Sequence, residues 1–378
     1  MTGVSSLMSV VVPLRTDDFA FYSKRLVLRD SLLLKNIQTV VVDDGSSEKA
    51  AAEISFFCKE RGYEYIRLES GSQPFSLSRA RNAGLQAAQS EFVYFDDADL
   101  VYTQAFFQSL LNQLQLIDCT PFNFFSLPTI CLTAVASSQV IADGVLDAIY
   151  PRVLQALLLE DPKGGPANKM IESYAPASGV LALRRDLALQ LGGYDEAFVG
   201  WGGEDRDFIF RLLAINDELP LPSAFDQTES WNLNDTLIFQ GWRSLHRIHG
   251  EFMARQGLYA SHLHHERLAW RKPLVSAQNM KRAAEKTLLV TKSERIAEKV
   301  FDLQSTILFD TYRSSQLLWH KNLPNELIER IHEVNRSKEI SLGSKQPFWK
   351  KMRKLMESPK AFLADSRFKL FRSVSRFF

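Results

Sequence analysis

The sequence predicts an α/β protein with a mainly parallel sheet that carries helices on both faces, followed by a helical C-terminal extension. Short β-branched or aromatic runs alternate with helical patterns through the first hundred residues, and such helices are the crossovers that parallel strands require. Clusters of aspartates also follow two of the predicted strands directly, at the sheet edge where ligands bind in such folds.

The elements of the first half follow from this alternation. The runs Ser9–Leu14 and Thr39–Val42 are β-branched and suit buried strands, and the turn-forming residues Asp43–Ser47 end the second one. We expect strands at 9–14, 39–42, 65–68 and 92–95, and helices at 18–34, 49–61, 76–88 and 104–116.

The second half gives weaker patterns. After the helix at 104–116 we expect irregular segments and a Gly/Pro-rich loop at 161–167, and after Arg211 a Pro-rich connector, an aromatic stretch and a His-rich segment at 246–265. Between these segments we expect a strand at 178–183 and helices at 186–191 and 205–213, and later a helical pattern from 277 to 332.

The composition excludes several classes of protein. With 46% apolar and 24% charged residues the chain of 378 residues is neither disordered nor a rod. Its three cysteines lack the short spacing of a disulfide scaffold or a Cys-rich zinc module. We expect no signal peptide in residues 1–14, no membrane span in the apolar window 122–142, and a cytoplasmic protein.

Two acidic clusters are candidates for ligand binding. Asp43 and Asp44 follow the second predicted strand, and Asp96–Asp99 follow the fourth. Carboxylates two residues apart, such as Asp97 and Asp99, can share one divalent cation with pyrophosphate oxygens. Short acidic motifs also recur by chance as turns that cap helices, and for the tripeptide alone that alternative is the more common.

A group of histidines offers further metal ligands. His262 and His265 lie three residues apart and can face one way on a turn or helix, and imidazole is a common ligand of first-row metals. For the segment His262–His265 alone, surface or packing histidines are the more common alternative, and His246, His249 and His264 compete with this pair.

The segment Gly200–Asp207 combines glycines, an aromatic ring and acids. Its glycines would let the backbone approach a ligand closely, and Trp201 offers a flat face for a sugar ring. Asp205, beside Glu204, could take a proton from an attacking hydroxyl. The alternative is a helix with acids at its N-terminal end, and both interpretations can hold together.

Taken together, these motifs resemble inverting, metal-dependent glycosyltransferases of the GT-A fold and of the family 2-like type. The matching stretches are VVVDDGSS at 40–47, RARNAG at 79–84, EFVYFDDAD at 91–99 and WGGEDRD at 201–207. The last is especially similar to that of β-1,4-galactosyltransferases and bacterial chondroitin-type polymerases. The resemblance covers residues 8–270, and the order and spacing of the motifs make it specific.

The resemblance implies donor-binding roles in the nucleotide half. Asp43 or Asp44 would bond the uracil, beside Pro13 at the end of the first strand. Arg79 would approach the diphosphate, and Asn82 would steady the loop.

The resemblance also implies a metal centre that holds Mn²⁺ or Mg²⁺. Asp99 would be the main ligand, with Asp97 nearer the donor ribose or a metal-bound water. His265 would complete the shell, and His262 matches the place of a second imidazole ligand. Because Asp96 replaces the apolar residue that is usual before this motif, the choice of acids stays open.

In the acceptor half, the resemblance implies that Asp205 is the general base. Glu204 and Gly203 would contact the acceptor, and Trp201 would stack on the sugar.

The expected function is transfer of a hexose unit from a UDP-sugar to a glycan or lipid-linked glycan acceptor. The resemblance places this step in bacterial surface polysaccharide synthesis, either of capsule or of lipopolysaccharide, with galactose, N-acetylgalactosamine, N-acetylglucosamine or glucuronic acid as the donor sugar. A nucleotidyltransferase would also use acids at strand ends, but the Gly-rich, Lys-containing phosphate loop is missing near the first strand. A catalytically inactive sugar-binding or scaffold subunit is the other alternative.

We expect a catalytic domain over residues 1–275, divided into a nucleotide half (1–117) and an acceptor half (118–275), then a helical region (276–342) and a basic tail (343–378). From Lys345 onward there are ten Lys/Arg against Glu357 and Asp365, a local charge of +8 that leaves the other 344 residues at −7. The acidic body predicts no nucleic-acid partner. The basic, aromatic tail suits peripheral attachment to the inner face of an anionic membrane, with a packed or disordered appendix as the alternative.

Overall fold

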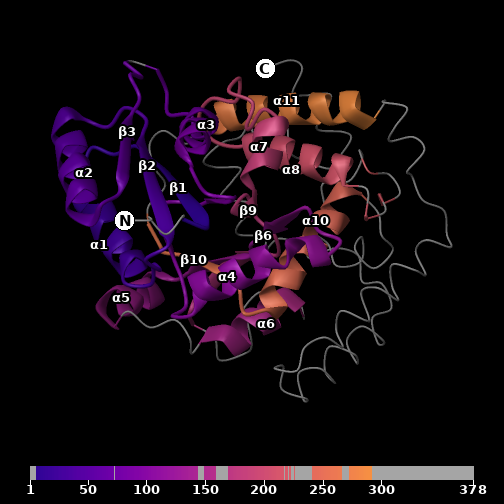
Figure 1. The fold of residues 1–378 in the computed structure, drawn as a ribbon, viewed down its shortest axis with the longest axis horizontal. Helices are drawn as coiled ribbons and strands as arrows, with labels where there is room; N and C mark the ends of the chain where they lie inside the picture. Colours follow the sequence, from indigo (N-terminus) through magenta and orange to yellow (C-terminus); the bar gives the residue numbers. More distant parts are fainter. Residues whose placement is uncertain are drawn as a thin grey trace, which may run out of the picture.

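The computed structural model describes residues 6–71, 73–143, 149–158, 169–216, 218–219, 221–222, 225, 241–265 and 272–291. Within these residues the predicted α/β class is confirmed. A six-stranded sheet has the strand order β3-β2-β1-β4-β9-β6, and a smaller four-stranded sheet has the order β5-β10-β7-β8 (Figure 1).

Four parallel strands form the first half of the large sheet, as the alternation predicts. They are β1 (Met8–Leu14), β2 (Ile37–Asp43), β3 (Glu64–Arg67) and β4 (Phe92–Phe95), joined by helices α1 (Phe19–Asp30), α2 (Glu48–Arg61) and α3 (Leu77–Ala87). In the register of the sheet, Val11 of β1 lies opposite Val40 of β2 and Phe95 of β4. All seven residues of β1 are buried, since the strand is central and covered on both faces. The carboxyl ends of these strands therefore meet at one edge.

Two antiparallel strands complete the large sheet. Strand β9 (Leu181–Arg184) pairs with β4, and β6 (Phe124–Ser126) pairs with β9. The strand predicted at 178–183 corresponds to β9, whereas β6 falls in a region that we expected to be irregular. Because β6 has three residues within a longer apolar window, no alternation distinguishes it in the sequence.

The second sheet corrects the expectation of irregular structure after residue 116. It contains β5 (Leu100–Val101), β7 (Thr129–Leu132), β8 (Ile171–Ala175) and β10 (Ala260–His262). These strands have two to five residues, too few for a period to emerge, and their pairing depends on segments far apart in the chain. His262 lies opposite Leu100, so the sheet brings the end of the described His-rich segment to the residues after Asp99.

The remaining described helices surround the two sheets. They are α4 (Phe106–Gln115), the 3₁₀ turn η1 (Ile117–Cys119), α5 (Ala134–Asp143), α6 (Tyr150–Leu158), α7 (Arg185–Gln190), α8 (Glu204–Ile215), α10 (Trp242–Arg255) and α11 (Pro273–Thr291). Helix α10 was missed by the sequence interpretation, which treated 246–265 only as a His-rich segment. The predicted loop at 161–167 lies outside the described residues.

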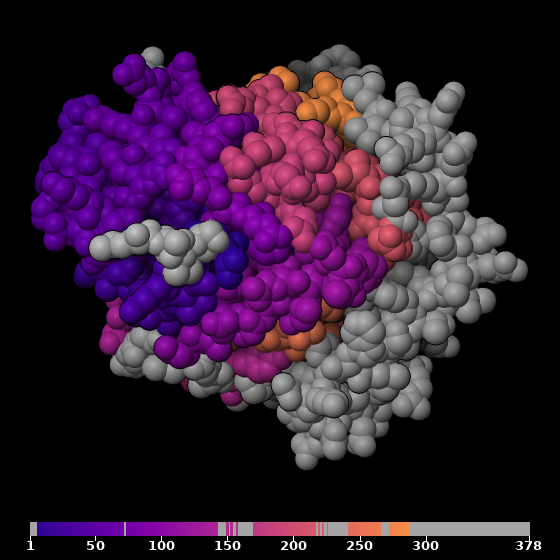
Figure 2. Space-filling view, in the orientation of Figure 1, coloured from indigo at the N-terminus to yellow at the C-terminus, as the bar shows by residue number. Residues whose placement is uncertain are grey.

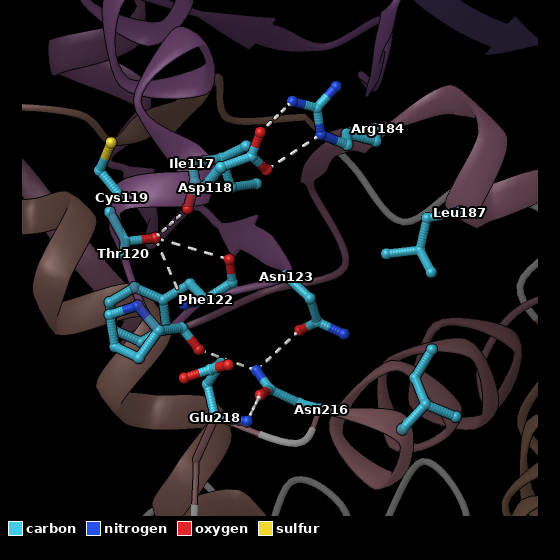
Figure 3. Close-up of a pocket in the computed structure, with 12 residues that line it drawn as sticks. Ile117, Asp118, Cys119, Thr120, Phe122, Asn123, Arg184, Leu187, Asn216 and Glu218 are labelled. Carbon is cyan, nitrogen blue, oxygen red and sulfur yellow. Dashed lines mark hydrogen bonds and ion pairs between the residues drawn. The ribbon is translucent and has the colours of Figure 1, made fainter.

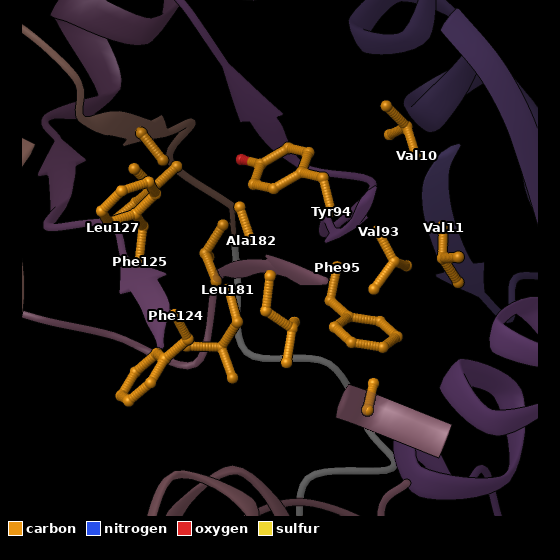
Figure 4. Packing of buried hydrophobic residues seen from close by; sticks show 14 of the residues in the cluster. Val10, Val11, Val93, Tyr94, Phe95, Phe124, Phe125, Leu127, Leu181 and Ala182 are labelled. Atoms are coloured by element: carbon orange, nitrogen blue, oxygen red, sulfur yellow. The ribbon is translucent and has the colours of Figure 1, made fainter. Parts of the chain in front are cut away.

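Apolar side chains from strands distant in sequence make one core across the large sheet. Figure 4 shows Val10 and Val11 of β1, Phe95 of β4, Phe124 of β6 and Leu181 of β9 in this cluster. All five are fully buried. In the space-filling view, the described segments before and after residue 170 accordingly meet in one continuous body (Figure 2).

Helix α11 begins at Pro273, four residues before the predicted helical pattern, and packs against α8. Residues 292 onward, which include the rest of that pattern and the basic tail, lie outside the described residues. None of the described helices is both long and apolar enough to span a membrane.

We predict that Gly84→Ala destabilises the fold. A Cβ at Gly84 of α3 would lie 2.2 Å from Cγ1 of Val11 in the central strand, so α3 and β1 would have to separate. Overpacking of this kind costs about 1–3 kcal/mol of unfolding free energy, which denaturant titration measures. Gln86→Ala, on the exposed face of the same helix, is the control. Equal stability of Gly84→Ala and the wild type would contradict the close contact.

Candidate active site

Strand β4 delivers four consecutive residues, Asp96–Asp99, to the edge of the sheet, and the first of them points inward. Asp96 is fully buried and accepts a hydrogen bond of 2.9 Å from Nη1 of Arg29 in α1, and another from the Tyr102 hydroxyl. Burial raises the pKa of Asp96 to about 6, against the opposing effect of Arg29 and Tyr102. The Asp96 carboxylate is therefore bound by Arg29 and Tyr102, and this favours Asp97 and Asp99 as metal ligands.

Asp99 lies beside the two histidines that the sequence singles out. Its Oδ2 is 3.2 Å from Nε2 of His262 and 3.1 Å from Nε2 of His265. The pairing of β10 with β5 makes this contact, since it sets the residues before Leu100 against those that follow Ser261. The ring of Phe21 packs edge-on against His265 at 5.7 Å.

These three side chains form a group that could hold a metal ion. One ligand atom from each of Asp99, His262 and His265 lies within 4.8 Å of the others. Burial raises the pKa of Asp99, but the two imidazoles lower it by more than burial raises it. The pKa therefore lies well below its ordinary value. Two imidazole nitrogens and one carboxylate oxygen form a donor set that suits first-row divalent metals and leaves positions open for a substrate.

The competing histidines have other surroundings. His246 and His249 are buried on α10, where Nε2 of His246 is 2.9 Å from the Ser126 hydroxyl and Nδ1 of His249 is 3.0 Å from the Phe124 carbonyl oxygen. Burial lowers the pKa of His249 to about 3 and that of His246 well below its ordinary value. His264 instead pairs with Glu172 at 3.4 Å. These three histidines are therefore packing or surface residues.

Arg81 joins the two halves of the site. Its buried guanidinium donates a hydrogen bond of 3.0 Å from Nη2 to Oδ1 of Asp97, and its Nη1 lies 3.8 Å from Oε1 of Glu204. Its carbon Cζ is 5.1 Å from the centre of the Tyr194 ring. Burial lowers the pKa of Arg81, but Tyr194 and the nearby carboxylates raise it above its ordinary value. A fixed positive charge thus stands between the aspartate motif and the start of α8.

The glycine-rich loop before α8 is shaped by close contacts. Gly200, Gly202 and Gly203 have φ between 77° and 96°, a region that favours glycine. The amide of Gly200 donates a hydrogen bond of 2.8 Å to the Phe75 carbonyl oxygen, which joins the loop to the segment before α3. Trp201 remains 39% exposed.

The proposed base and its neighbour occupy the first turn of α8. Asp205 is half-buried, and a Cβ at Gly179 would lie 2.8 Å from the Asp205 Cβ, so this glycine allows the close approach. Glu204 is 4% exposed. Burial, together with the charge of Asp205, raises the pKa of Glu204 to about 8 against the opposing effect of Arg81.

Several predicted donor-binding residues are engaged within the protein. Asp43 accepts hydrogen bonds from the Ser46 amide and the Tyr65 hydroxyl, and Asp44 accepts them from Ser70, Ser76 and Arg79. Both aspartates are fully buried, and Pro13 is buried within β1. Recognition of uridine by these residues, and of diphosphate by Arg79, stays a prediction.

Asn82 fastens α3 to the loop after α7. Its Nδ2 donates to the Tyr194 carbonyl oxygen at 2.8 Å and its Oδ1 accepts from the Tyr194 amide at 2.8 Å. The close approach of Gly193, where a Cβ would lie 2.4 Å from Oδ1 of Asn82, permits this arrangement.

Three residues in this network were given no role by the sequence interpretation: Arg29, Arg81 and Tyr102. Arg81 stands inside the quoted motif RARNAG, so its presence was visible although its partners were not. Arg29 lies on the buried face of α1. The signal for its role was Asp96, a charged residue at a position where an apolar one is usual, because a buried carboxylate needs a partner.

A separate cavity of about 640 Å³ lies near the amino-terminal end of strand β4, at the opposite end of this strand from the acidic motif. Arg184, in its wall, lies opposite Phe92, the first residue of β4, whereas the acidic motif follows the last. Figure 3 shows Arg184 paired with Asp118, and Asn123 bonded to Asn216. The cavity is therefore remote from the acidic edge.

We predict that Glu204 makes stability depend on pH. The pKa of Glu204 is about 8 in the folded state, above the ordinary glutamate value. Its contribution to the free energy of unfolding is therefore complete below about pH 4.5 and is lost as the pH rises through 8. For one such proton, the unfolding free energy falls by up to about 1.4 kcal/mol per pH unit. Glu204→Gln should flatten the curve from denaturant titrations, whereas Glu53→Gln on the exposed side of α2 should retain it. The same slope in Glu204→Gln and the wild type would contradict the assignment.

Comparisons with known proteins agree with the motifs. The chain is 27% identical over 212 residues to the pre-mycofactocin glycosyltransferase of Mycobacterium tuberculosis, which covers 56% of this chain and 40% of that protein. It is 23% identical over 192 residues to the chondroitin synthase of Pasteurella multocida, covering 47% and 20%. The chain thus spans less than half the length of these curated relatives.

Similar solved structures include two glycosyltransferases. TarS 1–349 of S. aureus in complex with UDP-GlcNAc has a TM-score of 0.42 at 12% identity, with 87% of both chains covered. The mannosyltransferase PcManGT of Pyrobaculum calidifontis in complex with GDP-Man and Mn²⁺ has a TM-score of 0.36 at 12% identity, with 89% of both chains covered.

The family match extends over most of the chain. The profile of the family described as "Glycosyltransferase like family 2" matches residues 9–288, from β1 into α11. The chain therefore carries a glycosyltransferase domain and belongs to the Glycosyltransferase like family 2.

Proposed function

We propose that this protein transfers a hexose unit from a UDP-sugar to a hydroxyl of a glycan acceptor, with the help of a divalent cation and with inversion at the anomeric carbon. One observation carries the proposal. Arg81 contacts both Asp97, two residues before Asp99 in the metal-type cluster, and Glu204, the neighbour of Asp205. The guanidinium of Arg81 thus lies between the segment with the proposed metal ligand Asp99 and the segment with the proposed base Asp205.

Asp99, His262 and His265 would hold the cation, because they supply the carboxylate and imidazole ligands that Mn²⁺ accepts. Asp97, two residues before Asp99 in the chain, is 37% exposed at its side chain, which leaves it able to contact the donor or a bound water. When bound, the cation would neutralise charge that develops on the leaving diphosphate.

The acceptor side follows from the first turn of α8. Asp205 would take the proton from the attacking hydroxyl, and Trp201 would stack on the sugar. With its raised pKa, Glu204 carries a proton at neutral pH and can donate a hydrogen bond to an acceptor oxygen. Attack from the face opposite an α-linked diphosphate gives a β-linked product.

The wider setting is also part of the proposal. We place the transfer in bacterial surface polysaccharide synthesis, on a glycan or lipid-linked glycan at the inner face of the membrane. The net charge of +8 from Lys345 onward supports peripheral attachment. The relatives' printed names, a pre-mycofactocin glycosyltransferase and a chondroitin synthase, are compatible with several acceptors.

We predict that the cation and UDP bind together and that Asp99 is needed for both. UDP affinity, measured by calorimetry, should fall by at least about tenfold in chelator and recover with Mn²⁺ or Mg²⁺. Asp99→Ala should reproduce the loss in the presence of metal, whereas His264→Ala, on the exposed histidine that pairs with Glu172, should not. Full UDP affinity and turnover without metal would contradict the proposed metal centre.

We predict that Asp205→Asn removes transfer and leaves donor binding intact. Loss of a general base lowers the rate by about 10²–10⁴-fold, which UDP release with candidate UDP-sugars and acceptors measures, while the UDP dissociation constant should stay within about twofold. Asp186→Asn, in the first turn of α7, is the control. Near-native transfer by Asp205→Asn would exclude it as the base, and UDP binding without turnover in the wild type would favour the inactive scaffold.

A further inference from the structure

A second cavity, of about 1090 Å³, lies between α11 and the two loops at 73–75 and 197–200. Figure 1 shows α11 lying along α8. The charged residues that line the cavity are five cations and one acid. We call this cavity the basic cleft; its charged residues are Arg15, Lys272, Lys281, Arg282, Lys286 and Glu285.

One face of α11 forms the wall of the basic cleft. Val275, Asn279, Arg282 and Lys286 follow one another at intervals of four, three and four residues, which places them on one side of a helix. All four line the cleft. The helix is fixed in this orientation, because Asn279 donates a hydrogen bond of 2.8 Å to the Val199 carbonyl oxygen and Lys286 lies 2.7 Å from Asp195 and 2.9 Å from Asp207.

The cations differ in how far carboxylates neutralise them. Lys286 is held by two aspartates, and Lys281 pairs with Glu285 at 3.7 Å across an exposed turn of the helix. The guanidinium of Arg15 donates to the Gln73 carbonyl oxygen at 2.7 Å, a neutral partner. Arg282 is exposed and stands 6.0 Å from the centre of the Phe198 ring, and its charge also acts on Asp195, the partner of Lys286. The five cations therefore still outnumber the carboxylates Glu285, Asp195 and Asp207 that act on them.

The position of the basic cleft connects it to the acceptor side of the site. Gly200, in its wall, immediately precedes Trp201, and a Cβ at Gly200 would lie 3.0 Å from Val275 of α11. Phe75 and Val275 add apolar surface. The cluster of Asp99, His262 and His265 is a separate group, next to Phe21 of α1. Arg79, which donates a hydrogen bond to Gln73 in the wall of the cleft, would meet the donor diphosphate together with the cation, and we assign the remaining charge of the cleft to another anion.

We propose that the basic cleft binds an anionic unit of the acceptor, a sugar that carries a carboxylate or a phosphate ester, and that Arg15 and Arg282 are its main charged contacts. The proposal rests on the proposed function, since it names the substrate class of the acceptor side. An anion in this cleft would be attracted by several cations at once, and apolar surface beside them suits the carbon face of a sugar ring.

Calorimetric titration of the full-length protein with four probes tests the proposal. The probes are a tetrasaccharide of alternating glucuronate and N-acetylglucosamine, neutral chitotetraose, N-acetylglucosamine 1-phosphate and N-acetylglucosamine. We expect at least one acidic probe to bind about tenfold more tightly than its neutral counterpart, with the advantage reduced in high salt. The acidic probe that binds identifies the anion as carboxylate or phosphate. Equal binding of acidic and neutral probes overturns the proposal.

Charge reversal localises the effect. Arg282→Glu should remove about tenfold of affinity for the acidic probe, and Lys49→Glu, on an exposed lysine of α2 outside the cleft, should remove little. UDP binding in Mn²⁺ should not change in Arg282→Glu. A loss of UDP affinity in this variant, or equal losses of acidic-probe affinity in both variants, overturns the proposal. Failure of UDP and Mn²⁺ to bind the wild type would refute the proposed function instead, and the probe titrations would still report on the cleft.

Discussion

The buried guanidinium of Arg81 is the interaction on which the rest of the site depends. It contacts Asp97 at the end of β4 and Glu204 at the start of α8, over the ring of Tyr194. A buried charge is tolerated only beside an opposite charge, so Arg81 depends on Asp97, and its own charge limits the rise in the pKa of Glu204. Arg81 thereby connects two segments that lie more than a hundred residues apart in the sequence.

Residues that do not belong to the proposed metal or acceptor groups hold those groups in place. Arg29 and Tyr102 hold Asp96 inside the fold, and this fixes the turn that presents Asp97 and Asp99. On the other side, α11 lies against the glycines of the loop before α8, where a Cβ at Gly203 would lie 2.8 Å from the Asn279 carbonyl oxygen. The helix thus packs against the segment that carries the proposed base, and the division predicted at residue 275 stays a prediction.

Local pattern was sufficient for the parallel half of the fold and insufficient for the remainder. The runs of valine in β1 and β2, and the acids after β4, follow from short-range chemistry that a single sequence displays. The strands β5, β7, β8 and β10 are too short to display a period. Helix α10 does carry apolar residues at helical spacing, Trp242, Leu245, Ile248 and Phe252, and the sequence interpretation missed them because it considered only the histidines of this segment. The grouping of Asp99 with His262 and His265 came from resemblance, whereas the roles of Arg29 and Arg81 needed tertiary contacts that spacing does not encode.

The proposed function requires a divalent cation between Asp99, His262 and His265. Crystals of the full-length protein grown with UDP and Mn²⁺ would locate it through anomalous scattering recorded on both sides of the manganese absorption edge. We expect a peak within about 2.0–2.4 Å of the Asp99 carboxylate and of at least one of the two imidazoles. A manganese peak elsewhere in the molecule, with these three side chains uncoordinated, would contradict it.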